Sequence, residues 1–459
     1  MKILVINSPL FRNTNNRYDE DSLPPIGLGL IATALEKSGH NVEFIDTVAL
    51  KMPLQELIHF VNGLKPDFIC SNVFTTNLEL VKELIEAVNY KTHFIIGSLA
   101  TQSLYAELFN LYTNNKIDII HGDGELITPA IVNDLIAQKP LYEGHNRRFF
   151  RVDNSSQYYV SDISEEFLNR SYFVNEPINH PLGFTEANIV TSRGCIYNCA
   201  FCAAAASLSK EFGTREKSVA SVKSEISKLI ELYPDIQSIR VLDDLFLKNS
   251  NSVSRAIEIF KDFDLQWRSM AHVQTFKDVS DETIRLLEKS RCKELFIGIE
   301  SGSPDILKQI HKTSNVELIK KNVTKLLMNN INVKGYFIYG FPNETVDDFE
   351  KTYMLAEYFK NVSKVYGSKF RTSVFQFRPY HGTEIYHDLK SKLGNDTFTR
   401  VATIEPNNQL SELVGRMQFN FHSGNYSNES IELVQKYIYK TVGLNTLYEL
   451  FPKNHSNFN

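Results

Sequence analysis

The chain has 459 residues, of which 42% are hydrophobic and 22% are charged. This length favours two domains, and the composition is typical of a soluble globular protein. The formal net charge of −5 provides no basic field for a nucleic-acid backbone, so a nucleic-acid partner is not favoured. We find no apolar run of about 18 residues and no signal-peptide pattern, so we expect no membrane span and a cytoplasmic location.

Strands and helices alternate through the first part of the chain. This spacing predicts right-handed crossovers and an α/β fold with a doubly wound parallel sheet, which we assign to a first domain over residues 1–138. Ligands of such sheets bind at the carboxyl ends of the strands. We expect strands over 2–7, 41–46, 68–73, 93–97 and 117–122, and helices over 27–38, 54–64, 78–89, 103–112 and 125–137.

A second alternating series follows an irregular stretch that we interpret as a linker over 139–185. Six strand–helix repeats predict a partial (β/α)6 barrel over 186–385, with its chemistry at the carboxyl ends of the strands. Residues 386–459 are expected to form a small, mostly helical region that caps the barrel or shapes a substrate pocket, with a frayed Asn- and Ser-rich end. We expect strands over 187–191, 239–243, 267–272, 294–300, 333–340 and 372–379, and helices over 219–232, 252–263, 281–289, 316–329, 346–359 and 429–439.

Three of the five cysteines lie within eight residues, which is unsuited to a disulfide framework. Cys195, Cys199 and Cys202 have C-x-x-x-C-x-x-C spacing. Three thiolates this close can bind three irons of a cubane and leave the fourth iron open. A structural zinc site is the alternative, but no further Cys or His follows at zinc-finger spacing. Chance clustering of buried cysteines is a third interpretation.

The segment 191–202 resembles the cysteine loop of the radical S-adenosylmethionine (SAM) superfamily. In that family the loop follows the first barrel strand, and here Phe201 fills its aromatic position. The resemblance implies a [4Fe–4S] cluster on Cys195, Cys199 and Cys202. It also implies that SAM binds the open iron and is cleaved to a 5′-deoxyadenosyl radical. Such chemistry implies an electron donor, for example a flavodoxin or ferredoxin.

Later strand ends resemble the SAM-binding motifs of the same family. The matching segments are 241–246, 297–303, 335–344 and 379–383. His272 and His381 depart from the family pattern, which often has arginine and proline there. Helix capping by the aspartates and backbone turns at the glycines are the alternative roles. The resemblance implies SAM binding by Phe201, Asp243, Asp244, Glu300, Ser301, Gly340 and Tyr380.

Segments 24–40 and 122–125 resemble the cobalamin-binding domain that many radical SAM enzymes carry. The D-x-H-x-x-G motif that supplies a histidine ligand to cobalt is absent, so cobalamin would bind without it, or the domain serves only as a scaffold. A dinucleotide fingerprint at Gly27 and Gly29 is a weak match, because a long loop separates it from the first strand. The resemblance implies a cobalamin-binding surface, here called the cobalamin bed, formed by Ser8, Gly27, Ser71, Asn72, Gly97, Ser98 and Gly122.

Three functions remain open at this point. With cobalamin, the family implies methylation of an unactivated carbon or phosphorus centre. Without it, the radical would drive epimerisation, cyclisation or rearrangement beside a scaffold domain. The non-enzymatic alternative is a zinc-bound interaction protein. The substrate, a small molecule or a peptide, and the residues that react with it are not indicated by any motif.

Overall fold

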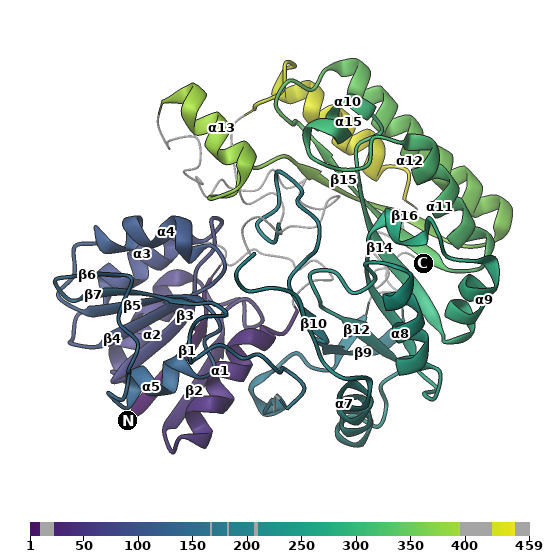
Figure 1. The fold of residues 1–459 in the computed structure, drawn as a ribbon. Helices are drawn as coiled ribbons and strands as arrows, with labels where there is room; N and C mark the ends of the chain where they lie inside the picture. Colours follow the sequence, from purple (N-terminus) through teal and green to yellow (C-terminus); the bar gives the residue numbers. More distant parts are fainter. Residues whose placement is uncertain (10–22, 166–167, 181–182, 206–209, 395–424, 446–459) are drawn as a thin grey trace, which may run out of the picture.

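The computed structural model has two seven-stranded sheets, each packed with its own helices, and the chain runs through one and then the other (Figure 1). The predicted α/β class, the first parallel sheet and the partial barrel are confirmed. No helix among the described residues is long and apolar enough to cross a membrane. The expected frayed end, beyond 445, lies outside the described residues. The structure describes residues 1–9, 23–165, 168–180, 183–205, 210–394 and 425–445.

The first sheet has seven strands in the order β2-β1-β3-β4-β5-β7-β6. All neighbours are parallel except β6 and β7. The chain places β2 on one side of β1 and then β3, β4 and β5 on the other, and this single change of direction at β1 makes the sheet doubly wound. Its strands are β1 (Lys2–Asn7), β2 (Asn41–Asp46), β3 (Phe68–Asn72), β4 (His93–Gly97), β5 (Lys116–Gly122), β6 (Tyr142–Gly144) and β7 (Arg147–Val152).

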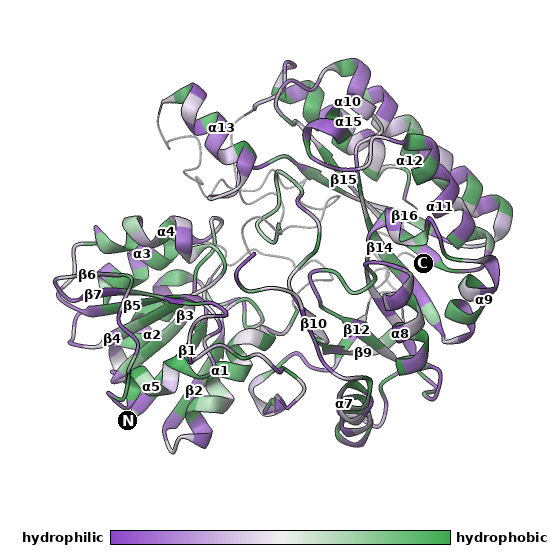
Figure 2. Cartoon of the chain, viewed as in Figure 1, coloured by the Kyte–Doolittle hydropathy of each residue, from purple (hydrophilic) through white to green (hydrophobic). Residues whose placement is uncertain are grey.

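Helices cover both faces of this sheet, and their apolar sides face the strands (Figure 2). Helices α1 (Ile26–Lys37) and α5 (Ile127–Val132) cover one face; α2 (Leu54–Leu64), α3 (Leu78–Ala87) and α4 (Thr101–Phe109) cover the other. Helix α5 is shorter than predicted, because Asp134 adopts a left-handed φ of 55° soon after its end.

Strands β6 and β7 lie in the stretch that the sequence indicated to be a linker. Strand β7 extends the first sheet beside β5, with Arg147 opposite Ile117. The guanidinium of Arg148 donates to Asp118 at 2.8 and 2.5 Å, so a charged residue is accommodated in a central strand pair. The three arginines of β7 interrupt the apolar pattern expected of a buried strand, and the partner that accommodates Arg148 lies 30 residues away in the sequence.

The second sheet has the order β16-β15-β14-β13-β12-β9-β8, and only β8 is antiparallel to its neighbour. Its six parallel strands follow one another in space as in sequence, which is the arrangement of an open barrel. The strands are β8 (Ile178–His180), β9 (Phe184–Ile189), β12 (Ser238–Val241), β13 (Gln266–Ala271), β14 (Cys292–Glu300), β15 (Asn332–Tyr339) and β16 (Phe370–Gln376).

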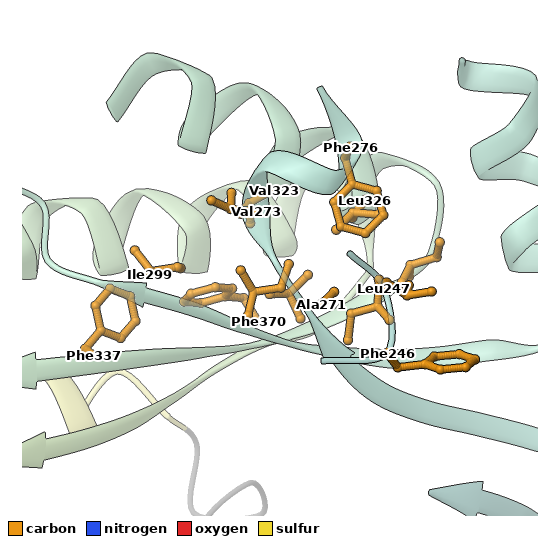
Figure 3. Close-up of a cluster of buried hydrophobic side chains, with 14 of the residues drawn as sticks. Phe246, Leu247, Ala271, Val273, Phe276, Ile299, Val323, Leu326, Phe337 and Phe370 are labelled. Atoms are coloured by element: carbon orange, nitrogen blue, oxygen red, sulfur yellow. The ribbon is translucent and has the colours of Figure 1, made fainter. Parts of the chain in front are cut away.

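A continuous apolar core fills the space between this sheet and its outer helices (Figure 3). Helix α15 (Ile431–Val442) also belongs to this layer. It covers the edge strand β16, where Thr372 Oγ1 donates to the Thr441 carbonyl at 3.0 Å. The other helices of the layer are α7 (Val219–Leu232), α8 (Ser250–Phe260), α9 (Asp281–Lys289), α10 (Pro304–Gln309), α11 (Val316–Met328) and α12 (Val346–Tyr366).

Helix α13 (Glu384–Leu393) leaves this layer and lies toward the first domain (Figure 1). The turn before it contacts that domain directly: the His381 amide donates to Thr75 Oγ1 at 3.1 Å, and a side chain at Gly382 would meet Ser103. The two domains are therefore joined by the chain after β16 as well as by the chain before β9.

Four charged side chains form a buried network inside the barrel. Arg268 donates to Glu186 at 2.5 and 2.9 Å and to Glu294 at 3.1 Å. Arg371 binds Glu294 at 2.7 and 2.8 Å. The nearby guanidinium groups lower the pKa of Glu294 to about 2, so its carboxylate stays charged at neutral pH despite burial.

We expect Glu294→Gln to lower the free energy of unfolding by about 3–5 kcal/mol, because it leaves two buried arginines short of a counter-charge. Urea unfolding followed by the fluorescence of Trp267, the single tryptophan of the chain and the neighbour of Arg268, measures it. Glu258→Gln, which removes an exposed ion pair with Lys223, should leave the transition unchanged. Equal midpoints for the two variants would contradict this role of Glu294.

Candidate functional site

A cavity of about 440 Å³ lies between the two domains. One wall consists of the carboxyl ends of β3, β4 and β5 and the start of α1. The other wall comes from the second domain, from the loops that follow β9 and β12. The position agrees with the rule that parallel sheets bind ligands at the carboxyl ends of their strands.

Most of the predicted cobalamin bed meets at this cavity. Ser8 does not line it: its hydroxyl is buried below the wall, bonded to the Ser71 hydroxyl and donating to the Asn72 carbonyl at 2.7 Å. Ser8 thus supports the bed from behind. The six predicted residues that line the cavity are Gly27, Ser71, Asn72, Gly97, Ser98 and Gly122.

Two oxygen atoms on the first-domain wall of the cavity have no hydrogen-bond partner among the described residues. They are Glu125 Oε2 and Thr128 Oγ1, both buried. Buried polar atoms are normally paired, so both are suited to a ligand that supplies donors. At Gly27 an added Cβ would meet no atom within 4 Å, and at Gly97 only a carbonyl at 3.8 Å. The wall is therefore open at both glycines and can accept a broad, flat ligand.

The cysteine loop leaves and rejoins the second domain through a small ribbon. Strand β10 (Ser192–Arg193) pairs antiparallel with β11 (Arg215–Glu216), and the loop between them contains all three cysteines. Gly194 has a φ of +86°, and a Cβ there would lie 2.7 Å from the Gly213 carbonyl. The two ends of the loop therefore approach more closely than residues with side chains allow.

The loop is also held in its middle. The ring of Tyr197 stacks on His272 with centroids 3.6 Å apart, and the backbone of Ala200 bonds to Ile310 and Ile385 at 3.1 and 3.2 Å. Phe201 packs edge-on against Phe341. The predicted aromatic position thus anchors the loop to the segment after β15.

The three thiols are partly exposed, and burial raises their pKa values, that of Cys202 to about 12. A nearby positive charge is therefore needed to keep them as thiolates, which a metal centre supplies. Among the described residues, no three Cys, His, Asp or Glu side chains meet as ligands of a single ion. The C-x-x-x-C-x-x-C spacing along the chain suits thiolates that each bind a different iron of a cluster.

Asp243 and Asp244 are adjacent but face different surroundings. Asp243 is buried and accepts from the Thr191 amide and hydroxyl at 2.6 and 2.7 Å and from the Ser192 hydroxyl at 2.6 Å. Asp244 is exposed on the cavity wall, where the Gly194 amide donates to its carboxylate over a long 3.3 Å. Asp243 therefore holds the base of the loop, and the Asp244 carboxylate remains accessible to a ligand.

Glu300 ends β14 in a left-handed conformation with φ +65°, beside a bulge in the pairing with β15. Its Oε1 lies 3.1 Å from Lys312 Nζ, which also donates to the Gly298 carbonyl at 2.9 Å. The charge of Lys312 opposes the burial that raises the pKa of Cys199, so this ion pair stands close to the cysteine loop. Lys312 could not be predicted from the sequence, because no local pattern distinguishes it from a surface lysine.

The other predicted SAM residues are placed differently. Ser301 is fully buried, with its hydroxyl 3.0 Å from Thr352 Oγ1 on α12. Gly340 has a φ of +92°, and its amide donates at 2.6 Å to Glu344, a carboxylate that the sequence analysis did not single out. Burial raises the pKa of Glu344 to about 8. Tyr380 is partly buried, and its carbonyl accepts from Thr383.

Comparisons with known proteins match both halves of the chain. Residues 189–356 match the radical SAM superfamily, and residues 18–132 match the B12 binding domain. An uncharacterized methyltransferase of Pyrococcus horikoshii is 25% identical over 92% of both chains. The cytidylyl-2-hydroxyethylphosphonate methyltransferase of Streptomyces wedmorensis is 22% identical over 78% of this chain and 77% of its own length.

Solved structures share the fold. The cobalamin-dependent S-adenosylmethionine radical enzyme OxsB, in its apo form, matches 93% of this chain and 64% of its own with a TM-score of 0.60 and 14% identity. Its complex with aqua-cobalamin and SAM matches 86% of this chain at a TM-score of 0.55, and this chain spans 55% of that chain. From these matches and its fold, the chain belongs to the radical SAM superfamily, as an enzyme with a B12-binding domain ahead of its radical SAM barrel.

Proposed function

We propose that this protein is a cobalamin-dependent radical SAM methyltransferase that acts on an unactivated carbon or phosphorus centre. One observation carries the proposal: a single cavity is walled by the strand ends of the B12-binding domain and by the base of the cysteine loop. A corrinoid and a SAM molecule bound at these two walls would face each other. The methyltransferase names of the two relatives support the reaction class.

When bound, the [4Fe–4S] cluster and SAM supply a 5′-deoxyadenosyl radical, and the corrinoid supplies a methyl group. The protein must hold these groups in order and keep water away. Cys195, Cys199 and Cys202 are the proposed iron ligands, and Asp243 fixes the ribbon from which their loop extends. Reduced thiols and a low-potential electron donor, such as a flavodoxin or ferredoxin, suit a cytoplasmic enzyme.

Three charged side chains are proposed to bind the amino-acid end of SAM, which carries an ammonium and a carboxylate. Asp244 and Glu300 offer carboxylates to the ammonium, and Lys312 offers a cation to the carboxylate. Charge-assisted hydrogen bonds of this kind are short and strong in a desolvated site. Ser301 and Gly340 instead shape the strand ends around SAM through their bonds to Thr352 and Glu344.

The corrinoid is proposed to lie on the first wall of the cavity. The open surface at Gly27 and Gly97 accepts the flat ring without displacing side chains. The carboxamides around a corrin ring are hydrogen-bond donors, and Glu125 Oε2 and Thr128 Oγ1 are acceptors that lack a partner among the described residues.

Alanine at any one of Cys195, Cys199 or Cys202 should reduce bound iron well below the about four per chain of a complete cubane. It should also abolish the formation of 5′-deoxyadenosine from SAM in the presence of dithionite. Iron and sulfide analysis of anaerobically purified protein measures the first effect, and liquid chromatography measures the second. Cys292→Ala is the control, because Cys292 is a buried core residue of β14. Stoichiometric zinc with little iron in the unaltered protein would refute the cluster.

Gly97→Val should weaken hydroxocobalamin binding by about tenfold or more. The two methyl groups of the valine would occupy the space that the corrinoid needs at this wall and would prevent close contact between them. Absorbance titration of the purified chain gives the dissociation constant without any turnover. Gly63→Val is the matched control: this glycine lies on the exposed side of α2, and an added Cβ meets no neighbour. If the unaltered chain binds no corrinoid, the proposal is refuted and the first domain serves as a scaffold.

Asp243→Asn should affect the stability of the protein, and Asp244→Asn should affect SAM binding. Asp243→Asn removes charge-assisted bonds and should lower the stability of the cofactor-free protein by about 1.5–3 kcal/mol. Asp244→Asn should leave that stability unchanged and weaken SAM binding to the cluster-loaded protein by about tenfold. Thermal unfolding and equilibrium dialysis separate the two, and the reverse pattern would overturn the assignment.

A further inference from the structure

The ribbon at the base of the cysteine loop contains two arginines that the proposed function has not used. Arg193 and Arg215 are register partners across β10 and β11. Both reach out of their own domain to Asp123, which follows β5 in the first domain. Arg193 Nη1 donates to Asp123 Oδ1 at 2.9 Å, and Arg215 donates to both carboxylate oxygens at 2.5 and 3.1 Å.

Further contacts close this cluster on both sides. Arg193 Nη2 donates to Glu125 Oε1 at 2.7 Å, and Asp123 also accepts from the Val160 amide at 3.0 Å. The guanidinium of Arg215 lies 4.4 Å from the ring centroid of Tyr159. Asp123 is only 6% exposed, so its bonds are well shielded from solvent.

This cluster connects the two walls of the cavity. The turn 122–125 belongs to the wall proposed for the corrinoid, and Arg193 precedes the first cysteine by two residues. A side chain at Gly122 would collide with Phe212 of the cysteine loop, whose nearest atom would be 2.5 Å away. The turn and the loop are therefore packed together as well as ion-paired.

We propose that Asp123, Arg193, Arg215 and Glu125 form a latch that fixes the distance between the corrinoid wall and the cysteine loop. The four are positioning residues, and the inference rests on the proposed function for its purpose. Asp243 ties the ribbon to the barrel, and the latch ties the same ribbon to the first domain. Two carboxylates, Asp243 of the second domain and Asp123 of the first, thus hold the base of the loop.

The test compares Asp123→Asn, Arg193→Gln and Arg193→Lys with Arg148→Gln in the full-length chain. Arg148→Gln is the matched control, because it breaks an ion pair with Asp118 in the same sheet, four residues before Gly122 on β5. Amide hydrogen exchange is measured first, on protein without cofactors. Asp123→Asn and Arg193→Gln should raise exchange in 122–125 and 191–195 by about tenfold, Arg193→Lys by less, and Arg148→Gln in neither segment.

The second measurement uses protein loaded with the reduced cluster and cob(II)alamin, both of which are paramagnetic. In the unaltered chain the cluster should shorten the spin relaxation time of cob(II)alamin. In Asp123→Asn both cofactors should stay bound, but the relaxation time should be shortened less and should spread over a wider range of values, because the distance between the cofactors is no longer fixed. Unchanged exchange and unchanged relaxation in Asp123→Asn would overturn the latch. A chain that binds no corrinoid refutes the proposed function alone, because hydrogen exchange still decides whether the latch exists.

Discussion

Two like charges directly opposite each other in a β-ribbon are destabilising unless a counter-charge lies close by. Arg193 and Arg215 are such a pair, and the ribbon's own acid, Glu216, pairs instead with Lys248 and Arg255. The counter-charge comes from the first domain, through Asp123 and Glu125. The second domain therefore depends on the first for the charge balance of its cysteine loop, and the two domains act as one unit.

The glycines around the ribbon follow from the same constraint. Bringing a buried carboxylate to two arginines requires close backbone approach, and the backbone at Gly122 adopts a φ of +110° beneath the Phe212 ring. Gly194 and Gly213 allow the loop to close above the ribbon. A loop fixed at its base and its middle loses little freedom on binding a ligand, which supports the proposal that its cysteines bind a metal centre.

The sequence is sufficient for the features that depend on local pattern. Strand–helix alternation predicted both sheets, and cysteine spacing predicted the loop. Features that depend on a distant partner were not accessible. Strand β7 carries arginines because Asp118 on the next strand accepts from Arg148. Lys312 matters only because the chain returns it to Glu300. Asp243 and Asp244 are adjacent residues of the same type, so the sequence does not distinguish them. Their roles differ because the Asp243 side chain faces Thr191, whereas the Asp244 side chain faces the cavity.

The charges around the cavity have a consequence for its ligands. The described charged residues that line it are Asp123, Glu125, Arg193, Arg215 and Asp244. The first four neutralise one another in the ion cluster, which leaves the carboxylate of Asp244 facing the space beside the cysteine loop. A carboxylate in a partly desolvated cavity attracts a cationic group more strongly than the same carboxylate in water. Because SAM carries a sulfonium and an ammonium, this charge balance supports the proposal that SAM binds at this wall and that a corrinoid, with its neutral donors, binds at the other.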